Sequence, residues 1–159
     1  MPRSSKPDPD DPAACERAAV ALLARREHTR RELARKLSAR AFDADVVAAT
    51  LDRLEQAGLL DGRRFIESFV ASRAARGFGP VKIRAELLER GVDPGSASEA
   101  LRESAEDWRA HARSVRRKRF GAEAPKDFKE RARQARFLQY RGFDQEQIDA
   151  ALDLQEDYD

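Results

Sequence analysis

The amino-acid sequence predicts an all-α fold in which three tandem three-helix repeats form an elongated array. An Arg-small-apolar-Asp turn recurs about every 50 residues, at 40–43, 90–93 and 141–144. Leucines fall in register around each copy, namely Leu37, Leu87 and Leu138 before the turn and Leu51, Leu101 and Leu152 after it. The composition is also helical, because 38% of the residues are charged, 41% are hydrophobic, and only 8 are Gly and 7 are Pro. Repeats of this length stack and share their apolar cores.

Breaks in the helical pattern divide the chain into segments. The N-terminal residues are rich in Pro, Asp and Ser and have too few apolar side chains to fold. The last residues are acidic, and chain ends of this kind fray. The predicted segments are a disordered tail at 1–12, repeats at 13–60, 61–104 and 105–154, and a frayed end at 155–159.

The first repeat has clear helix start signals. Its first helix is expected over about 13–26, where apolar residues recur at helical spacing. Thr29 and Glu32 have the spacing of a capping box, so a second helix begins there. Asp43 is a short carboxylate suited to cap the third helix, which ends at Gly58.

The second repeat shows the same order. Asp61 is placed to cap its first helix, which residues 77–80 (Gly-Phe-Gly-Pro) interrupt. Pro80 suits the first position of the next helix, because no N–H is needed there. Gly91 can take the left-handed conformation that ends this helix, and Asp93 can cap the last one.

The third repeat contains the most basic run of the chain. Residues 108–121 include six Arg or Lys residues and no acid, and their apolar positions keep helical spacing. Asp127 is expected to cap the second helix of this repeat, which ends at Gly142. Asp144 and Gln147 form a second capping-box pattern at the start of the final helix.

The sequence shows no constellation for catalysis or metal binding. His28 and His111 lack the spacing of metal ligands, and no Gly-rich loop follows a strand as a nucleotide-binding loop would. The single Cys15 cannot form an internal disulfide, which fits a reducing compartment. We therefore expect a binding protein, with no enzyme activity, no metal and no cofactor.

Hydropathy predicts a soluble cytoplasmic protein without a membrane partner. No apolar run approaches the roughly 18 residues that a membrane-spanning helix needs. The N-terminus also lacks the apolar core of a signal peptide. We expect a monomer.

Three stretches of the sequence are similar to a known family. They are REHTRRELARKL, then GLLDGRRFIESFVASRAARGFGPVKIRAELLERGVD, and then RQARFLQYRGFDQEQIDAAL. With the loops between them, these stretches resemble the RecX family over about residues 14–152. Two positions depart from the family pattern. Ala41 stands where the other two turns have Gly, and Gly62 stands where members often have an acid after Asp61.

The resemblance implies a function as well as a shape. RecX proteins are bacterial regulators of the RecA recombinase. A member of the family is expected to be a curved helical array that binds RecA and its filament on single-stranded DNA. It would inhibit the recombinase, ATPase and coprotease activities of RecA. In that way it would modulate homologous recombination, DNA repair and the SOS response.

Basic side chains on the first and second helices of the repeats are the predicted contact face, because they can follow DNA phosphates or acidic patches of RecA. The predicted set is Arg30, Arg31, Arg35 and Lys36 in repeat one, Arg73, Arg76, Lys82 and Arg84 in repeat two, and Arg113, Arg116, Arg117, Lys118, Lys126, Arg133 and Arg136 in repeat three. The competing interpretation is that these charges only solvate helix faces.

Aromatic residues are assigned mainly to the core. Trp108, Phe65, Phe69 and Phe137 lie on apolar stripes. Phe78 and Tyr140 lie near turns, and the sequence does not assign them to the core or to the surface. The arginines that precede the three turns (Arg40, Arg90 and Arg141) are interpreted as charges that meet helix dipoles.

Two further function classes stay open from the sequence. Three-helix units with basic second helices could bind single- or double-stranded DNA directly, in the manner of helix-turn-helix proteins. No unit, however, has a base-reading set of Arg, Asn and Gln at a helix N-terminus. The other class is a protein-only helical adaptor. The salt dependence of binding distinguishes these two classes, because the affinity for DNA falls steeply as the salt concentration rises.

Overall fold

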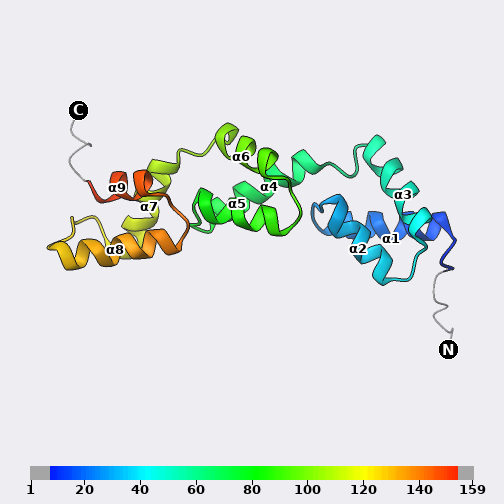
Figure 1. Cartoon of the computed structure of the whole chain (residues 1–159), viewed down its shortest axis with the longest axis horizontal. Helices are drawn as coiled ribbons and strands as arrows, with labels where there is room; N and C mark the ends of the chain where they lie inside the picture. Colours follow the sequence, from blue (N-terminus) through cyan, green and yellow to red (C-terminus); the bar gives the residue numbers. More distant parts are fainter. Residues whose placement is uncertain (1–7, 154–159) are drawn as a thin grey trace. The chain divides into compact units, whose positions relative to one another are not determined.

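The computed structural model describes residues 8–153, which form nine α-helices and no strand (Figure 1). The helices are α1 (Pro12–Arg25), α2 (Arg30–Ala39), α3 (Ala44–Gln56), α4 (Gly62–Ala75), α5 (Pro80–Glu89), α6 (Pro94–Glu103), α7 (Trp108–Phe120), α8 (Phe128–Tyr140) and α9 (Gln145–Leu152). The predicted all-α fold with three helices in each repeat is confirmed. Residues 1–7 of the tail expected at 1–12, and the end expected to fray at 155–159, lie outside the described residues.

The chain divides into two compact units, with the boundary between Ser68 and Phe69 inside α4. The first unit holds α1, α2 and α3, and the second holds α5 to α9. The predicted elongation and curvature of the array stay a prediction.

The core of the first unit joins one apolar face from each of its helices. α1 contributes Cys15 and Ala19, and both are fully buried. α2 contributes Leu33 and Leu37, which come together from one helical face because they are four residues apart. α3 adds Val47, Leu51 and Leu54. The Cys15 thiol is thus enclosed by apolar side chains.

Caps at the helix starts follow the sequence signals at most positions. The Thr29 hydroxyl accepts a hydrogen bond from the Glu32 backbone N–H at 3.0 Å. Asp144 and Gln147 form the complete capping box expected of them. Asp43 differs, because its side chain makes no capping hydrogen bond.

Residues 8–12 differ from the predicted disordered tail. Asp11 caps α1, which starts at Pro12, by accepting hydrogen bonds from the next two free backbone N–H groups. The Pro9 carbonyl accepts a hydrogen bond from the Asp43 backbone N–H at 2.9 Å. This contact ties the segment to the start of α3, and the sequence pattern offered no signal for it.

The three turns that define the repeat share one backbone conformation. Ala41, Gly91 and Gly142 have φ of 66°, 88° and 95°. Ala41 therefore takes the left-handed conformation despite its side chain, at a cost of roughly 1 kcal/mol. The departure from Gly at this position leaves the turn itself intact.

Repeats two and three are joined by backbone contacts within the second unit. The Gly79 N–H donates to the Arg141 carbonyl at 2.8 Å, and the Val81 N–H donates to the Gly142 carbonyl at 2.9 Å. The α4–α5 turn thus pairs with the α8–α9 turn. A Cβ atom at Gly142 would lie 2.3 Å from the Lys82 Cβ atom, so only glycine fits this approach.

Candidate functional site

The four predicted contact residues of α2 have different environments. Arg31 and Arg35 are exposed. Arg30 pairs with Asp52 at 2.8 Å and Glu55 at 3.1 Å on α3, and the hydrogen bond to Asp52, the larger cause, raises its pKa. The remaining residue, Lys36, is half-buried and bonds to a histidine side chain. Only two of the four are therefore free cations at the surface.

The predicted residues of repeat two are mostly engaged within their own unit. Arg73 pairs with Glu86 at 2.6 Å, with both side chains about three-quarters buried. Arg84 donates a hydrogen bond to the Ser98 hydroxyl at 2.9 Å. Arg76 is exposed. Arg73 and Arg84 thus hold helices together more than they offer charge to a partner.

Repeat three presents the largest exposed group. Arg117, Lys118, Lys126, Arg133 and Arg136 are exposed. Arg133 forms an ion pair with Glu130 at 3.1 Å, and its own side chain keeps 61% exposure. A pair this exposed contributes little and releases its cation readily.

Two residues of the predicted group on α7 do not face outward. Arg113 is half-buried, and its Nε donates to the Ala150 carbonyl at 3.2 Å. Arg116 requires a correction, because only 1% of it is exposed and it cannot belong to a contact face.

Arg116 instead anchors the loop between α7 and α8. Its guanidinium donates to the Gln134 side-chain oxygen at 2.9 Å and to the backbone carbonyls of Gly121 and Glu123. Burial lowers the pKa of Arg116, and the positive charge of Arg117 lowers it further. These carbonyl and amide oxygens satisfy the buried donors, as a buried charge requires. The acid-free run in the sequence gave no sign that one member turns inward.

One face of α8 carries a row of exposed side chains. Lys129, Arg133, Arg136 and Tyr140 are spaced by four, three and four residues, so they project from the same side of the helix. Tyr140 is 78% exposed. We call these four residues the α8 basic face. Lys129 and Tyr140 were absent from the predicted contact set.

Aromatic rings lie under Arg133 of this face and under Arg119 of α7. The Arg133 guanidinium lies 5.5 Å from the Phe120 ring, and the Arg119 guanidinium lies 5.6 Å from the Phe137 ring. The Phe120 and Phe137 rings meet edge to face at 5.3 Å. Contacts of this kind hold flexible cationic side chains in place.

The chain of rings and cations continues to the junction of repeats two and three. Arg141 lies 5.1 Å from the Phe137 ring and 5.6 Å from the Phe78 ring. Lys82 lies 4.7 Å from the Phe78 ring and 5.3 Å from the Tyr140 ring. Phe137, Phe78 and Tyr140 therefore support a cationic surface. The expectation that Phe137 serves only the core is incomplete.

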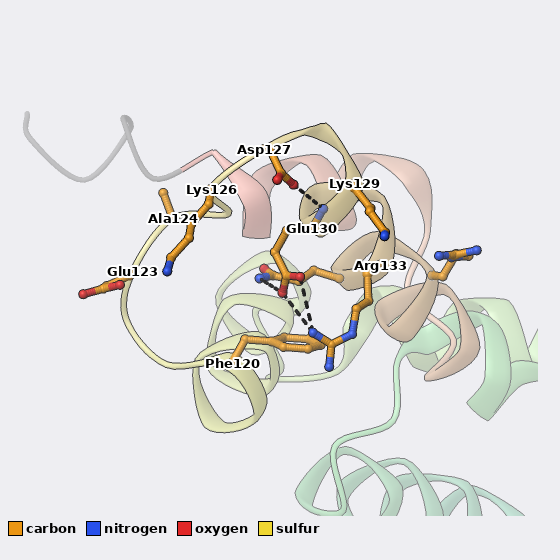
Figure 2. Close-up of a pocket in the computed structure, with 10 residues that line it drawn as sticks. Phe120, Glu123, Ala124, Lys126, Asp127, Lys129, Glu130 and Arg133 are labelled. Atoms are coloured by element: carbon orange, nitrogen blue, oxygen red, sulfur yellow. Dashed lines mark hydrogen bonds and ion pairs between the residues drawn. The ribbon is translucent and has the colours of Figure 1, made fainter.

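A shallow hollow of about 530 Å³ lies at the Lys129 end of the α8 basic face (Figure 2). Its walls come from the end of α7, the following loop and the start of α8. Figure 2 shows Lys129 and Arg133 on α8 with Phe120 below Arg133. The Glu130 carboxylate accepts hydrogen bonds from the Arg133 and Gln134 side chains. The hollow therefore mixes both charges around one aromatic ring.

Comparison with known families identifies all three repeats. The first three-helix domain of RecX matches residues 15–54, the second matches residues 61–101, and the third matches residues 105–152. The chain belongs to the RecX family.

Relatives of similar length support the same assignment. A regulatory protein RecX of Halorhodospira halophila is 54% identical over 134 residues, which cover 84% of this chain and 83% of the relative. The regulatory protein RecX of Pseudomonas entomophila is 45% identical over 150 residues, which cover 94% and 97%. These RecX relatives are named as regulators.

Two solved RecX structures share the fold. The crystal structure of RecX from Lactobacillus salivarius aligns with a TM-score of 0.76 at 21% identity, over 91% of this chain and 95% of that one. A second RecX crystal structure aligns with a TM-score of 0.71 at 18% identity, over 88% and 70%. At these identities the likeness shows the RecX fold alone.

Metal-binding clusters and membrane-spanning helices are absent from the part of this RecX chain that the structure describes. Within residues 8–153, no group of three His, Cys, Asp or Glu side chains is placed to hold a metal ion. In the same range, every helix is too short or too polar to cross a lipid bilayer.

Proposed function

We propose that this protein binds RecA and the RecA filament on single-stranded DNA and inhibits the recombinase, ATPase and coprotease activities of RecA. It would act by binding, as a cytoplasmic monomer, and so modulate homologous recombination, DNA repair and the SOS response. Membership of the RecX family supports a regulatory role. The observation that carries the proposal to particular residues is the α8 basic face with its supporting aromatic rings.

The α8 basic face has the chemistry that a nucleoprotein filament requires. Lys129, Arg133 and Arg136 can neutralise phosphates along a strand or acidic groups on RecA. Tyr140 adds an exposed ring at the end of the row, where an unpaired base or an apolar side chain can stack. The Phe120 ring beneath Arg133 reduces the entropy that this side chain loses on binding. We expect Arg117, Lys118 and Lys126 to extend the surface.

Direct binding to single-stranded DNA is the second candidate function. Interleaved cations and rings are typical of surfaces that track a single strand without reading its sequence. The observation that favours it is Lys82, which contacts two rings and lies next to the exposed Tyr140. A duplex-reading helix would need side chains that discriminate base edges, and the α8 basic face lacks Asn and Gln.

The test is RecA-catalysed ATP hydrolysis on single-stranded DNA, with the protein titrated in below stoichiometric amounts. Wild-type protein should inhibit, and the double variant Arg133→Glu, Arg136→Glu should inhibit at least about tenfold less, since reversing two contacts reverses their electrostatic attraction. The matched control is Arg17→Glu, Arg102→Glu. It makes the same charge change at exposed positions on α1 and α6.

The outcomes separate the two functions. Equal inhibition by both double variants would exclude the α8 basic face from the contact. If the wild-type protein leaves RecA unaffected but binds free single-stranded DNA with a steep salt dependence, direct DNA binding replaces filament regulation.

A further inference from the structure

A buried histidine meets a lysine side chain at the turn between α1 and α2. His28 is only 1% exposed, and its Nδ1 atom lies 3.0 Å from the Arg26 carbonyl oxygen. A carbonyl oxygen can only accept, so Nδ1 carries the proton and Nε2 has a free lone pair. Lys36 Nζ lies 2.8 Å from Nε2 and donates to it. The histidine is thus oriented by a backbone carbonyl toward an amine.

The surroundings lower the pKa of both groups. Burial is the main cause that lowers the pKa of His28, so the ring accepts hydrogen bonds at neutral pH. Burial also lowers the pKa of Lys36, followed by the charge of Arg26, and Glu32 opposes the shift. The guanidinium groups of Arg35 and Arg25 add to the lowering. A larger fraction of free amine is therefore present than on an ordinary lysine.

We propose that Lys36 is an acylation site, with acyl phosphates as the acyl donors and His28 as the proton acceptor. The amine donates one N–H to His28, so its lone pair points away from the ring. Nζ attacks the acyl carbon, the bond from that carbon to the phosphate oxygen breaks, and inorganic phosphate leaves. The extra Nζ proton passes to His28 Nε2 and then to water. The product is a neutral amide on Lys36.

The charge around Lys36 selects the donor class. Arg25 and Arg35 are exposed beside it, and Arg26 keeps 46% exposure of its side chain while pairing with Glu32. Their guanidinium groups attract the anionic phosphate of an acyl phosphate and stabilise it as it leaves. An acyl thioester has the same acyl chemistry but presents no anion next to its reacting carbon.

Other lysines of the chain provide internal controls. Lys118, Lys126 and Lys129 are exposed on repeat three, and no histidine is bonded to any of them. We expect these three to react as ordinary surface amines. Because Lys36 is less exposed than these three, a preference for Lys36 cannot result from exposure.

Acylation would change the predicted contact face. It removes the positive charge of Lys36 and its donation to His28 as an ammonium. Weaker filament binding is the expected consequence, and this consequence rests on the proposed function. The acylation itself does not, because it can be measured without RecA.

The experiment incubates the purified full chain with acetyl phosphate and follows each lysine by quantitative peptide mass spectrometry. Lys36 should acetylate roughly tenfold faster than Lys118 and Lys126, because a positioned base accelerates proton removal. Equal rates at the three lysines in the wild-type chain would overturn the proposal without any variant. Faster labelling of Lys36 by acetyl coenzyme A than by acetyl phosphate would overturn the donor class.

A variant isolates the role of the ring. His28→Asn keeps an N–H that can donate to the Arg26 carbonyl but has no acceptor at the Nε2 position. In a variant with wild-type helicity by circular dichroism, the Lys36 rate should fall to that of Lys118. An unchanged preference for Lys36 would remove His28 from the mechanism.

Discussion

The junction between repeats two and three depends on one glycine, and Gly142→Ala should separate them. Gly142 is buried with φ of 95° and lies against Lys82. An alanine Cβ would be 2.3 Å from the Lys82 Cβ atom and 2.7 Å from its backbone nitrogen. Because backbone cannot swing aside as a side chain can, the α4–α5 and α8–α9 turns must move apart.

The cost of this substitution has two parts. Alanine in a left-handed conformation costs about 1 kcal/mol once the stiffer unfolded chain is taken into account. Moving the turns apart stretches the hydrogen bonds from Gly79 and Val81, now 2.8 and 2.9 Å long. Two lost hydrogen bonds contribute about 2 kcal/mol. The expected loss in the free energy of unfolding is therefore about 3 kcal/mol.

Gly91→Ala is the matched control. Gly91 occupies the equivalent turn with φ of 88° in the same unit, and it is exposed. Its substitution should cost only the conformational part, about 1 kcal/mol. The difference between the two variants, about 2 kcal/mol, then isolates the contact between repeats.

Urea unfolding followed by circular dichroism measures both losses, and hydrogen exchange locates the change. The amides of Gly79 and Val81 should lose protection in Gly142→Ala, while the amide of Ile83, bonded within repeat two, keeps it. Equal stability of the Gly142→Ala and Gly91→Ala variants, with both amides still protected, would refute the reasoning.

Two other predictions concern the first unit. Ala41→Gly should raise the free energy of unfolding by about 1 kcal/mol in urea titrations, because it removes the left-handed strain of a side chain at φ of 66°; a loss of stability would show that Ala41 is not strained. Stability should also fall as the pH drops below 6.5, the ordinary pKa of His28, because burial lowers the folded-state value and the unfolded chain takes up the proton first. That contribution is complete above pH 6.5 and is lost as pH falls through the lower folded-state pKa. His28→Asn should reduce the difference in the free energy of unfolding between about pH 7.5 and 5.5, measured by urea unfolding. An identical dependence of the unfolding free energy on pH in both proteins would exclude His28 as its source.

Sequence pattern predicted most of the secondary structure of this protein because the signals are local. A cap such as Thr29 acts on an N–H group three residues away, and an apolar stripe needs only the helical period. The three repeats carry the same local signals, so the same helix assignment applies to each of them. The segment at 8–12 differs because the hydrogen bond from the Asp43 N–H to the Pro9 carbonyl joins residues far apart in the sequence.

The candidate site was less predictable, because its burial depends on how a loop folds over a helix. Arg116 and Arg117 are neighbours in one basic run, yet the first is buried and the second exposed. Periodicity gives the face of a helix but not the loop that folds over it. The buried place of Arg116 follows from carbonyl groups five and seven residues away, which accept its protons only once the loop has closed.

Local pattern thus sets the helices, their caps, the repeat and the family to which the chain belongs. Tertiary packing decides which cations remain available. It places rings from α7, α8 and the α4–α5 turn beneath Arg133, Arg141 and Lys82, and it brings His28 to Lys36. The physical reason is that cation–ring contacts and the desolvation of a charge depend on distances between elements, which residue spacing along one helix does not contain.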